Sequence, residues 1–170
     1  MLLNSLSPSA PPLVAPASGS MAVGRVLLVQ ESSVGESAVA STLRDEGFEV
    51  LDATCGADAL AIRDRCAIDA VVLNLAIPET QSFEICRNLK ALSPQMLPVL
   101  YLASQASQAR RVRALEAGLD GYVAPFEPRE LLASVAALVR RRRAGAAVAV
   151  AALAARARFS RSQRARARAT

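Results

Sequence analysis

The sequence contains no histidine and no tryptophan, and Lys90 is its single lysine. Without histidine, neither a mixed Cys/His zinc site nor a histidine-ligated cobalamin site can form. The three cysteines, Cys55, Cys66 and Cys86, include no CxxC pair, so we expect them to be small, buried or half-buried apolar residues in a reducing compartment. A GxGxxG dinucleotide-binding motif is also missing, and we expect no metal and no cofactor.

The sequence also lacks an apolar run of the about 20 residues that a membrane-spanning helix needs. The uncharged stretch over residues 144–155 has only twelve. Residues 1–22 carry no charge and four prolines, without the basic start and unbroken apolar core of a secretory signal. We expect residues 1–22 to be a disordered leader, with Met1 and Met21 both open as the start, and the protein to be cytoplasmic.

Acidic residues are missing from the C-terminal end. Residues 140–170 hold ten arginines and no acid, whereas residues 25–139 hold ten Lys+Arg and all fifteen Asp+Glu. Spaced arginines without acids attract polyanions by counterion release, or hold a chain to an anionic lipid surface. A tail that only adds solubility is the alternative. The arginines beyond the uncharged stretch are Arg156, Arg158, Arg161, Arg164, Arg166 and Arg168.

Between these two ends, strand and helix patterns alternate five times. Continuous apolar runs predict strands that are buried on both faces of a parallel sheet. The predicted strands cover residues 25–30, 48–54, 70–73, 98–102 and 121–123. The predicted helices run from a cap at Ser32 or Ser33 to Gly47, over residues 56–66, 82–92 and 105–117, and from Pro128 to about residue 158. This pattern predicts an α/β domain over residues 23–143, a doubly wound five-stranded parallel sheet, with a basic tail over residues 144–170.

Helical spacing predicts which side chains face the core. The expected inward residues are Val39, Ala40 and Leu43 in the first helix, Ala109, Val112 and Leu115 in the fourth, and Leu131, Val135 and Leu138 in the last. In such sheets, sites form at the carboxyl ends of the strands. We therefore expect Gln30, Glu31, Asn74 and Ala103 to be neighbours.

From Gly24 to about Arg142 the chain resembles the receiver domain of bacterial two-component response regulators, a flavodoxin-like (CheY-like) fold. The phrases that carry the resemblance stand in family order: VLLVQES, GFEVLDATCGADAL, VVLNLAIPETQSFEICRNLK, PVLYLAS and ALEAGLDGYVAPFEPRELL. The resemblance implies a phosphorylation site of five parts: two adjacent acids, an acceptor aspartate, a hydroxyl and a lysine. It also implies a cis bond between Ala124 and Pro125.

Four of these five parts are changed. The acid pair is Gln30-Glu31, and the acceptor position is Asn74. The hydroxyl position is Ala103, with the hydroxyl of the following Ser104 as an alternative, and the lysine position is Ala124 or is deleted. An amide oxygen is a poor nucleophile and a poor Mg²⁺ ligand, and a single carboxylate does not hold Mg²⁺ well. Glu31 lies on the wrong strand to replace the acceptor. We therefore expect a degenerate pseudo-receiver that is not an enzyme and is not phosphorylated.

The resemblance further implies a docking surface on the fourth helix, the fifth strand and the fifth helix. Tyr122 stands at the family's switch aromatic, and Arg110, Arg111 and Arg113 lie on the fourth helix. The expected function is phosphorylation-independent protein contact in two-component or phosphorelay signalling, with a histidine kinase or another response regulator, or with a second copy in a homodimer. The alternative is a polyanion-binding protein, for nucleic acid or an anionic membrane, in which the receiver fold is a scaffold for the tail.

Overall fold

A computed structural model describes residues 22–31, 37–74, 79–91 and 97–167. Strands and helices alternate along the chain, as the sequence predicted. The elements are β1 (Arg25–Gln30), α1 (Ala38–Asp45), β2 (Glu49–Ala53), α2 (Gly56–Arg65), β3 (Ala70–Asn74), α3 (Glu79–Ala91), β4 (Val99–Leu102), α4 (Gln108–Glu116), β5 (Gly121–Val123) and α5 (Pro128–Ala167).

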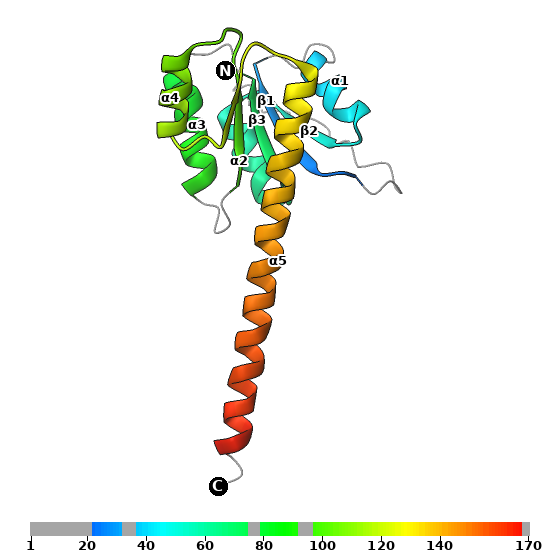
Figure 1. The fold of residues 1–170 in the computed structure, drawn as a ribbon, viewed down its shortest axis with the longest axis vertical. Coiled ribbons are helices and arrows are strands. Elements are labelled where there is room, and N and C mark those ends of the chain that lie inside the picture. The colour runs from blue at the N-terminus through cyan, green and yellow to red at the C-terminus, as the bar shows by residue number, and fades with distance from the viewer. Residues whose placement is uncertain (1–21, 32–36, 75–78, 92–96, 168–170) are drawn as a thin grey trace, which may run out of the picture.

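The five strands form one parallel sheet in the order β2-β1-β3-β4-β5. Helices α1 and α5 cover one face, and α2, α3 and α4 cover the other (Figure 1). Side chains of the central strands alternate between the two resulting cores, which is why these strands are apolar throughout. Leu27 and Val29 of β1 face the α2–α4 side, whereas Val26 and Leu28 face the α1/α5 side. The predicted three-layer α/β fold is confirmed.

The first helix begins later than predicted. Ser37 is its N-cap, and its hydroxyl accepts a hydrogen bond from the backbone N–H of Ala40 at 3.1 Å. The predicted caps Ser32 and Ser33 lie outside the described residues. The helix buries the predicted stripe of Val39, Ala40 and Leu43 and is followed by Gly47, whose φ of 89° suits glycine.

The predicted inward face of α4 is wrong. Val112 is 48% exposed and Leu115 51% exposed, and Ala109 is also exposed. The helix instead packs through Ala114, which is fully buried, and through Leu119 just beyond its end. The helix is therefore rotated relative to the prediction, and its apolar side faces away from the core.

The cysteines are only partly as expected. Cys86 is buried and Cys66 is half-buried, but Cys55 is exposed at the N-cap of α2, so the prediction is wrong for Cys55. Burial raises the pKa of the Cys86 thiol to about 11.

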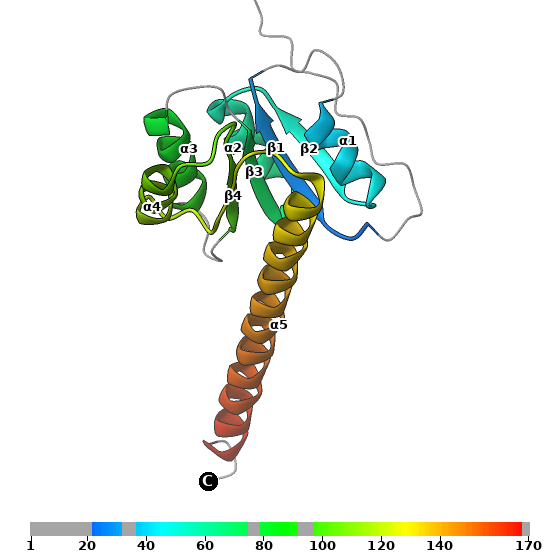
Figure 2. The ribbon, with the colours of Figure 1, turned by 45° about the horizontal axis from the view of Figure 1, so that its top comes forward.

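Helix α5 is 40 residues long and leaves the domain halfway along its length (Figures 1 and 2). Its start is capped by Glu127, whose carboxylate accepts from the N–H of Glu130 at 2.7 Å. The predicted inward residues, Leu131, Val135 and Leu138, are buried. The helix continues to Ala167, beyond the predicted end near residue 158. In the described part of the chain, no helix combines the length and the apolar character needed to cross a membrane.

Three consecutive arginines hold α5 where it leaves the domain. Arg141 donates to Asp120 at 2.7 Å, and Arg143 to Asp69 at 2.9 Å. Arg142 donates to the carbonyl of Ile68 at 3.0 Å. All three partners lie at the amino end of β3 or β5, so the helix leaves from the edge of the sheet where the strands begin (Figure 2).

Candidate functional site

The candidate site lies at the carboxyl edge of the sheet. Gln30 and Asn74 are register partners at the last positions of β1 and β3, and Glu31 follows Gln30 in an exposed bend. Ala103 follows β4 and is 6% exposed, and Ala124 follows β5 and is half-buried. The predicted neighbourhood at the strand ends is thus present in the fold.

The side chain of Gln30 is engaged in a hydrogen-bonded network with neighbouring side chains and not directed to a ligand. Its Nε2 donates to Oδ1 of Asp52 on β2 at 3.4 Å, and Nη2 of Arg44 on α1 donates to the other oxygen, Oδ2, at 2.6 Å. The arginine offsets the charge of Asp52, which the buried Gln30 could not do alone. Sequence reasoning missed Arg44 and Asp52, because nothing local links them to Gln30.

Among the described residues at this edge, Glu31 offers an exposed carboxylate, Asn74 offers an amide, and Ser104, which follows Ala103, offers an exposed hydroxyl. The resemblance noted in the sequence implies a Mg²⁺ site between an acid pair and an acceptor aspartate. This donor set does not fit Mg²⁺, which prefers hard, charged oxygen ligands in octahedral geometry. Within the ranges that the structure describes, no group of three or more His, Cys, Asp or Glu side chains is placed to hold a metal.

The ends of β4 and β5 are joined by the backbone. The N–H of Ala103 donates to the carbonyl of Val123 at 2.9 Å, and the Ala124–Pro125 bond is cis, as expected. Neither Ala103 nor Ala124 offers a hydroxyl or an ammonium group to an incoming anion.

Three aromatic rings, from α3, β4 and β5, pack next to one another near this edge. The rings of Tyr101 and Tyr122 are 5.9 Å apart, and those of Phe83 and Tyr101 are 6.1 Å apart in an edge-on arrangement. The hydroxyl of Tyr122 donates to the carbonyl of Gln105 at 3.2 Å. Sequence reasoning named only Tyr122; the register of β4 with β5, which places Tyr101 opposite Tyr122, would have added the second ring.

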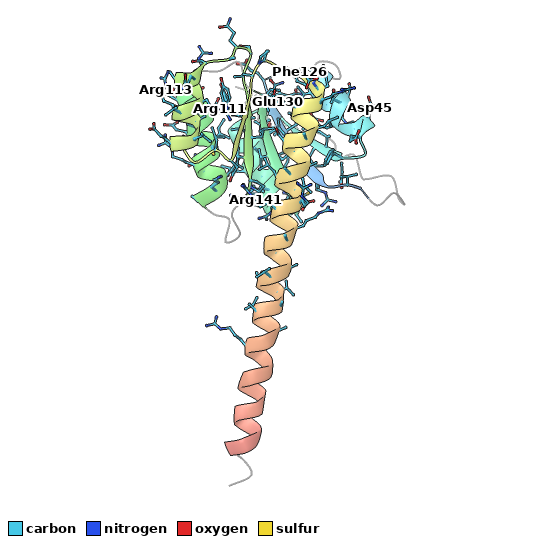
Figure 3. All side chains as sticks on the ribbon, in the orientation of Figure 1. Asp45, Arg111, Arg113, Phe126, Glu130 and Arg141 are labelled. Carbon is cyan, nitrogen blue, oxygen red and sulfur yellow. The ribbon has the colours of Figure 1, made fainter. Side chains whose placement is uncertain are left out.

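A hollow of about 510 Å³ lies between α4, β5 and the start of α5. Its apolar lining comes from Val112 and Leu115, the two side chains that were expected in the core, together with Tyr122. Arg111 on α4 and Glu130 on α5 supply opposite charges to its lining (Figure 3). The predicted docking residues are thus divided: Tyr122 and Arg111 line the hollow, whereas Arg110 and Arg113 do not.

The arginines of the tail are not part of either feature. Arg156 is exposed on the projecting part of α5. Four others lie on the same helix, and Arg168 lies outside the described residues; the four are Arg158, Arg161, Arg164 and Arg166.

Comparisons with known proteins agree with this architecture. The family model described as response regulator receiver domain matches residues 26–136. The sensory transduction protein RegX3 of Mycobacterium tuberculosis is 38% identical over 117 residues, which are 68% of this chain and 51% of that protein. The transcriptional regulatory protein PrrA of Mycobacterium leprae is 40% identical over 121 residues, or 71% of this chain and 52% of that protein. The chain therefore spans about half the length of the curated relatives it matches.

Solved structures give the same result. The chemotaxis protein CheY4 of Vibrio cholerae aligns with a TM-score of 0.60 and 28% identity, covering 69% of this chain and 99% of CheY4. A CheY-like receiver domain protein of Methanospirillum hungatei aligns with a TM-score of 0.60 at 23% identity, covering 71% and 96%, which shows the shared fold.

Proposed function

The chain belongs to the response regulator receiver domain family, and we propose that it acts in two-component signalling by protein contact alone, as a cytoplasmic, non-enzymatic pseudo-receiver. The observation that carries this proposal is Asn74 at the end of β3. Phosphoryl transfer depends on a positioned nucleophile and on charge neutralisation, and an amide supplies neither.

The surroundings of Asn74 support the same conclusion. Gln30 is engaged with Asp52, so the second metal-binding carboxylate has been replaced by a group that is already hydrogen-bonded. The side chains of buried Ala103 and half-buried Ala124 add no donors for phosphoryl oxygens. Among the described residues, the positions that would hold a metal or supply the lysine charge to a bound phosphoryl group are therefore changed.

The hollow beside α4 is the proposed contact surface for a histidine kinase, another response regulator or a second copy. Val112 and Leu115 are each about half exposed and line the same hollow, and exposed apolar side chains that lie together are typical of an interaction site. Arg111 and Glu130 would give a partner both a negative and a positive group to match.

The test is a titration of the full chain with beryllofluoride and Mg²⁺, followed by backbone amide NMR. We expect no saturable shifts at Glu31, Asn74 and Tyr122. Saturable shifts there would show that the site binds a phosphoryl mimic and would contradict the proposal. The contact surface is tested separately with Leu115→Glu, which should weaken binding to the two-component partner protein identified by screening proteins encoded in the same genome.

A matched control for Leu115→Glu is Leu153→Glu, at a similarly exposed apolar side chain on the projecting part of α5. It adds the same charge far from the hollow and should leave partner binding unchanged. Equal weakening by both variants would remove the hollow as the contact surface.

A second candidate function, polyanion binding, is favoured by one observation: α5 carries the basic end of the chain out of the acidic domain as a continuous helix. Deletion of residues 144–170 separates the two functions. Binding to a signalling partner should survive the deletion, whereas polyanion binding should be lost.

A further inference from the structure

We propose that the C-terminal end of α5, from Arg156 onward, docks on double-stranded DNA through its phosphates and without sequence preference. We call this segment the tip. The inference rests on the second proposed function and narrows its partner from polyanions in general to duplex DNA. It is independent of whether the domain accepts a phosphoryl group.

The arginines on α5 fall into two sets with different surroundings. Near the domain, Arg141 and Arg143 are paired with Asp120 and Asp69, so their charge is offset within the molecule. In the tip no acid follows, because residues 140–170 contain none. The unbalanced positive charge of the chain therefore gathers in the tip.

The segment between the two sets acts as a spacer. Residues 144–155 are uncharged and mostly alanine, the residue with the highest helix propensity. At about 1.5 Å per residue, the 13 steps from Arg143 to Arg156 separate the tip from the domain by about 20 Å. Val148, Val150 and Leu153 on this spacer are 64–69% exposed, so the described residues of the domain leave these three side chains uncovered.

The positions of the arginines favour a partner that surrounds the helix. Successive residues of an α-helix turn about 100° around the axis. On that basis the five tip positions within the described helix stand at about 0°, 80°, 160°, 240° and 300° for Arg158, Arg166, Arg156, Arg164 and Arg161. They are spread evenly, so no single face holds them all.

The major groove of duplex DNA meets this requirement. The groove is about 12 Å wide, which admits an α-helix of about 10–12 Å diameter, and phosphates line both of its walls. A flat anionic membrane would meet the arginines on only one side of the helix. A second copy of the tip would add like charge and repel.

Repulsion between the arginines of the tip also favours a partner with negative charge on both sides of the helix. Arg158, Arg161 and Arg164 follow one another at three-residue spacing, where like charges destabilise a helix. Phosphates on both sides would offset this repulsion. DNA binding should therefore increase the helical circular dichroism of the chain.

The test is fluorescence anisotropy of the full chain with a labelled duplex of about 20 base pairs and mixed sequence. Each phosphate contact contributes a slope of about −0.9 in log K against log salt, so five contacts predict a slope between about −4 and −5. Near 0.1 M salt the same relation gives about eightfold in affinity for each arginine.

Two matched variants each remove two positive charges. R161Q/R164Q in the tip should weaken binding by about 60-fold, the eightfold effect taken twice. R141Q/R143Q near the domain should change it by less than about threefold, since those charges are already paired. Equal losses in both variants would overturn the assignment to the tip, as would a salt slope near zero.

Binding to vesicles of phosphatidylcholine with about 30% phosphatidylserine is measured in parallel. The comparison distinguishes the inferred binding of duplex DNA from the more general function of polyanion binding on which it rests. Binding to DNA with weak vesicle binding supports duplex DNA as the partner. Binding to vesicles but not to DNA would overturn the inference and leave polyanion binding standing. Binding to neither at low salt would overturn both.

Discussion

Replacing Asp120 should reveal how strongly the domain holds α5 and the edge of the sheet together. The carboxylate of Asp120 is 13% exposed and accepts three hydrogen bonds: from Lys90 Nζ at 2.6 Å, from the N–H of Val99 at 2.9 Å and from Arg141 at 2.7 Å. It therefore links α3, β4 and α5 at the edge opposite the candidate site.

These bonds differ in value because their surroundings differ. A charged acceptor for the N–H of Val99 is worth about 1.5–3 kcal/mol. The pair with Lys90, whose side chain is 20% exposed, should contribute about 1 kcal/mol, well below the about 3–5 kcal/mol of a fully buried pair. Arg141 is 62% exposed, so its pair adds at most about 0.5 kcal/mol. Asp120→Ala should therefore cost about 3–4 kcal/mol of the unfolding free energy.

The assay is urea unfolding at neutral pH, followed by circular dichroism, with unchanged dependence on urea concentration as the check on the unfolded state. Asp120→Asn keeps an acceptor for the N–H of Val99 and should cost less than Asp120→Ala, while Arg141→Gln should cost under about 0.5 kcal/mol. An Asp120→Ala loss below about 1 kcal/mol, or an equal loss for Arg141→Gln, would refute the reasoning.

Three further predictions concern single side chains. Asn74→Asp alone should not allow labelling by acetyl phosphate, as measured by intact mass, because Gln30 remains bonded to Asp52 and no second acid is restored. Ser82→Ala should increase the free energy of unfolding by up to about 1 kcal/mol, and so raise the melting temperature, because the hydroxyl of Ser82 is buried without a partner among the described residues. A lower melting temperature would indicate that the hydroxyl has a partner. Cys86, with its pKa raised to about 11, should resist alkylation at pH 8 until the protein unfolds, as followed by mass spectrometry. Because the thiol of Cys86 ionises at a lower pH in the unfolded chain than in the folded one, its contribution to the unfolding free energy is fully present below pH 9.0 and is lost as the pH rises towards 11.

Strands were more predictable than helix orientation, for a physical reason. A strand buried on both faces is apolar throughout its interior, so the short apolar runs in β1 and β3, bounded by polar residues, indicate buried strands. A helix needs only one apolar stripe, and the spacing of Ala109, Val112 and Leu115 is the same whether that stripe meets the core or a partner. Ala114 occupies the core instead and is fully buried.

The helix cap was missed for a related reason. Ser32, Ser33 and Ser37 all offer a hydroxyl ahead of the same apolar stripe. Only the backbone decides among them, and the structure places the extended residue at Ser37, with φ of −69° and ψ of 148°. Sequence therefore predicted the helix and its buried face but not its first residue.

The candidate site was predictable as far as strand ends alone define it. The final positions of β1 and β3 place Gln30 beside Asn74, which the strand order requires. The chain from Arg44 through Asp52 to Gln30 was not predictable, because it joins three elements whose spacing appears only in the folded sheet.

Helix α5 connects the two proposals without coupling them. It begins beside the candidate site, a few residues after the cis bond at Pro125, and leaves at the opposite edge, held by Asp120 and Asp69. The part of the helix between these ends is buried against the sheet through Leu131 and Leu138, so this part packs as one unit with the domain. Under the proposed pseudo-receiver function, no phosphorylation at the site would shift this part of the helix, and we expect the tip to be presented constitutively. We therefore expect protein contact at the hollow and DNA contact at the tip to be able to occur together, because α5 carries the tip away from the domain (Figure 1).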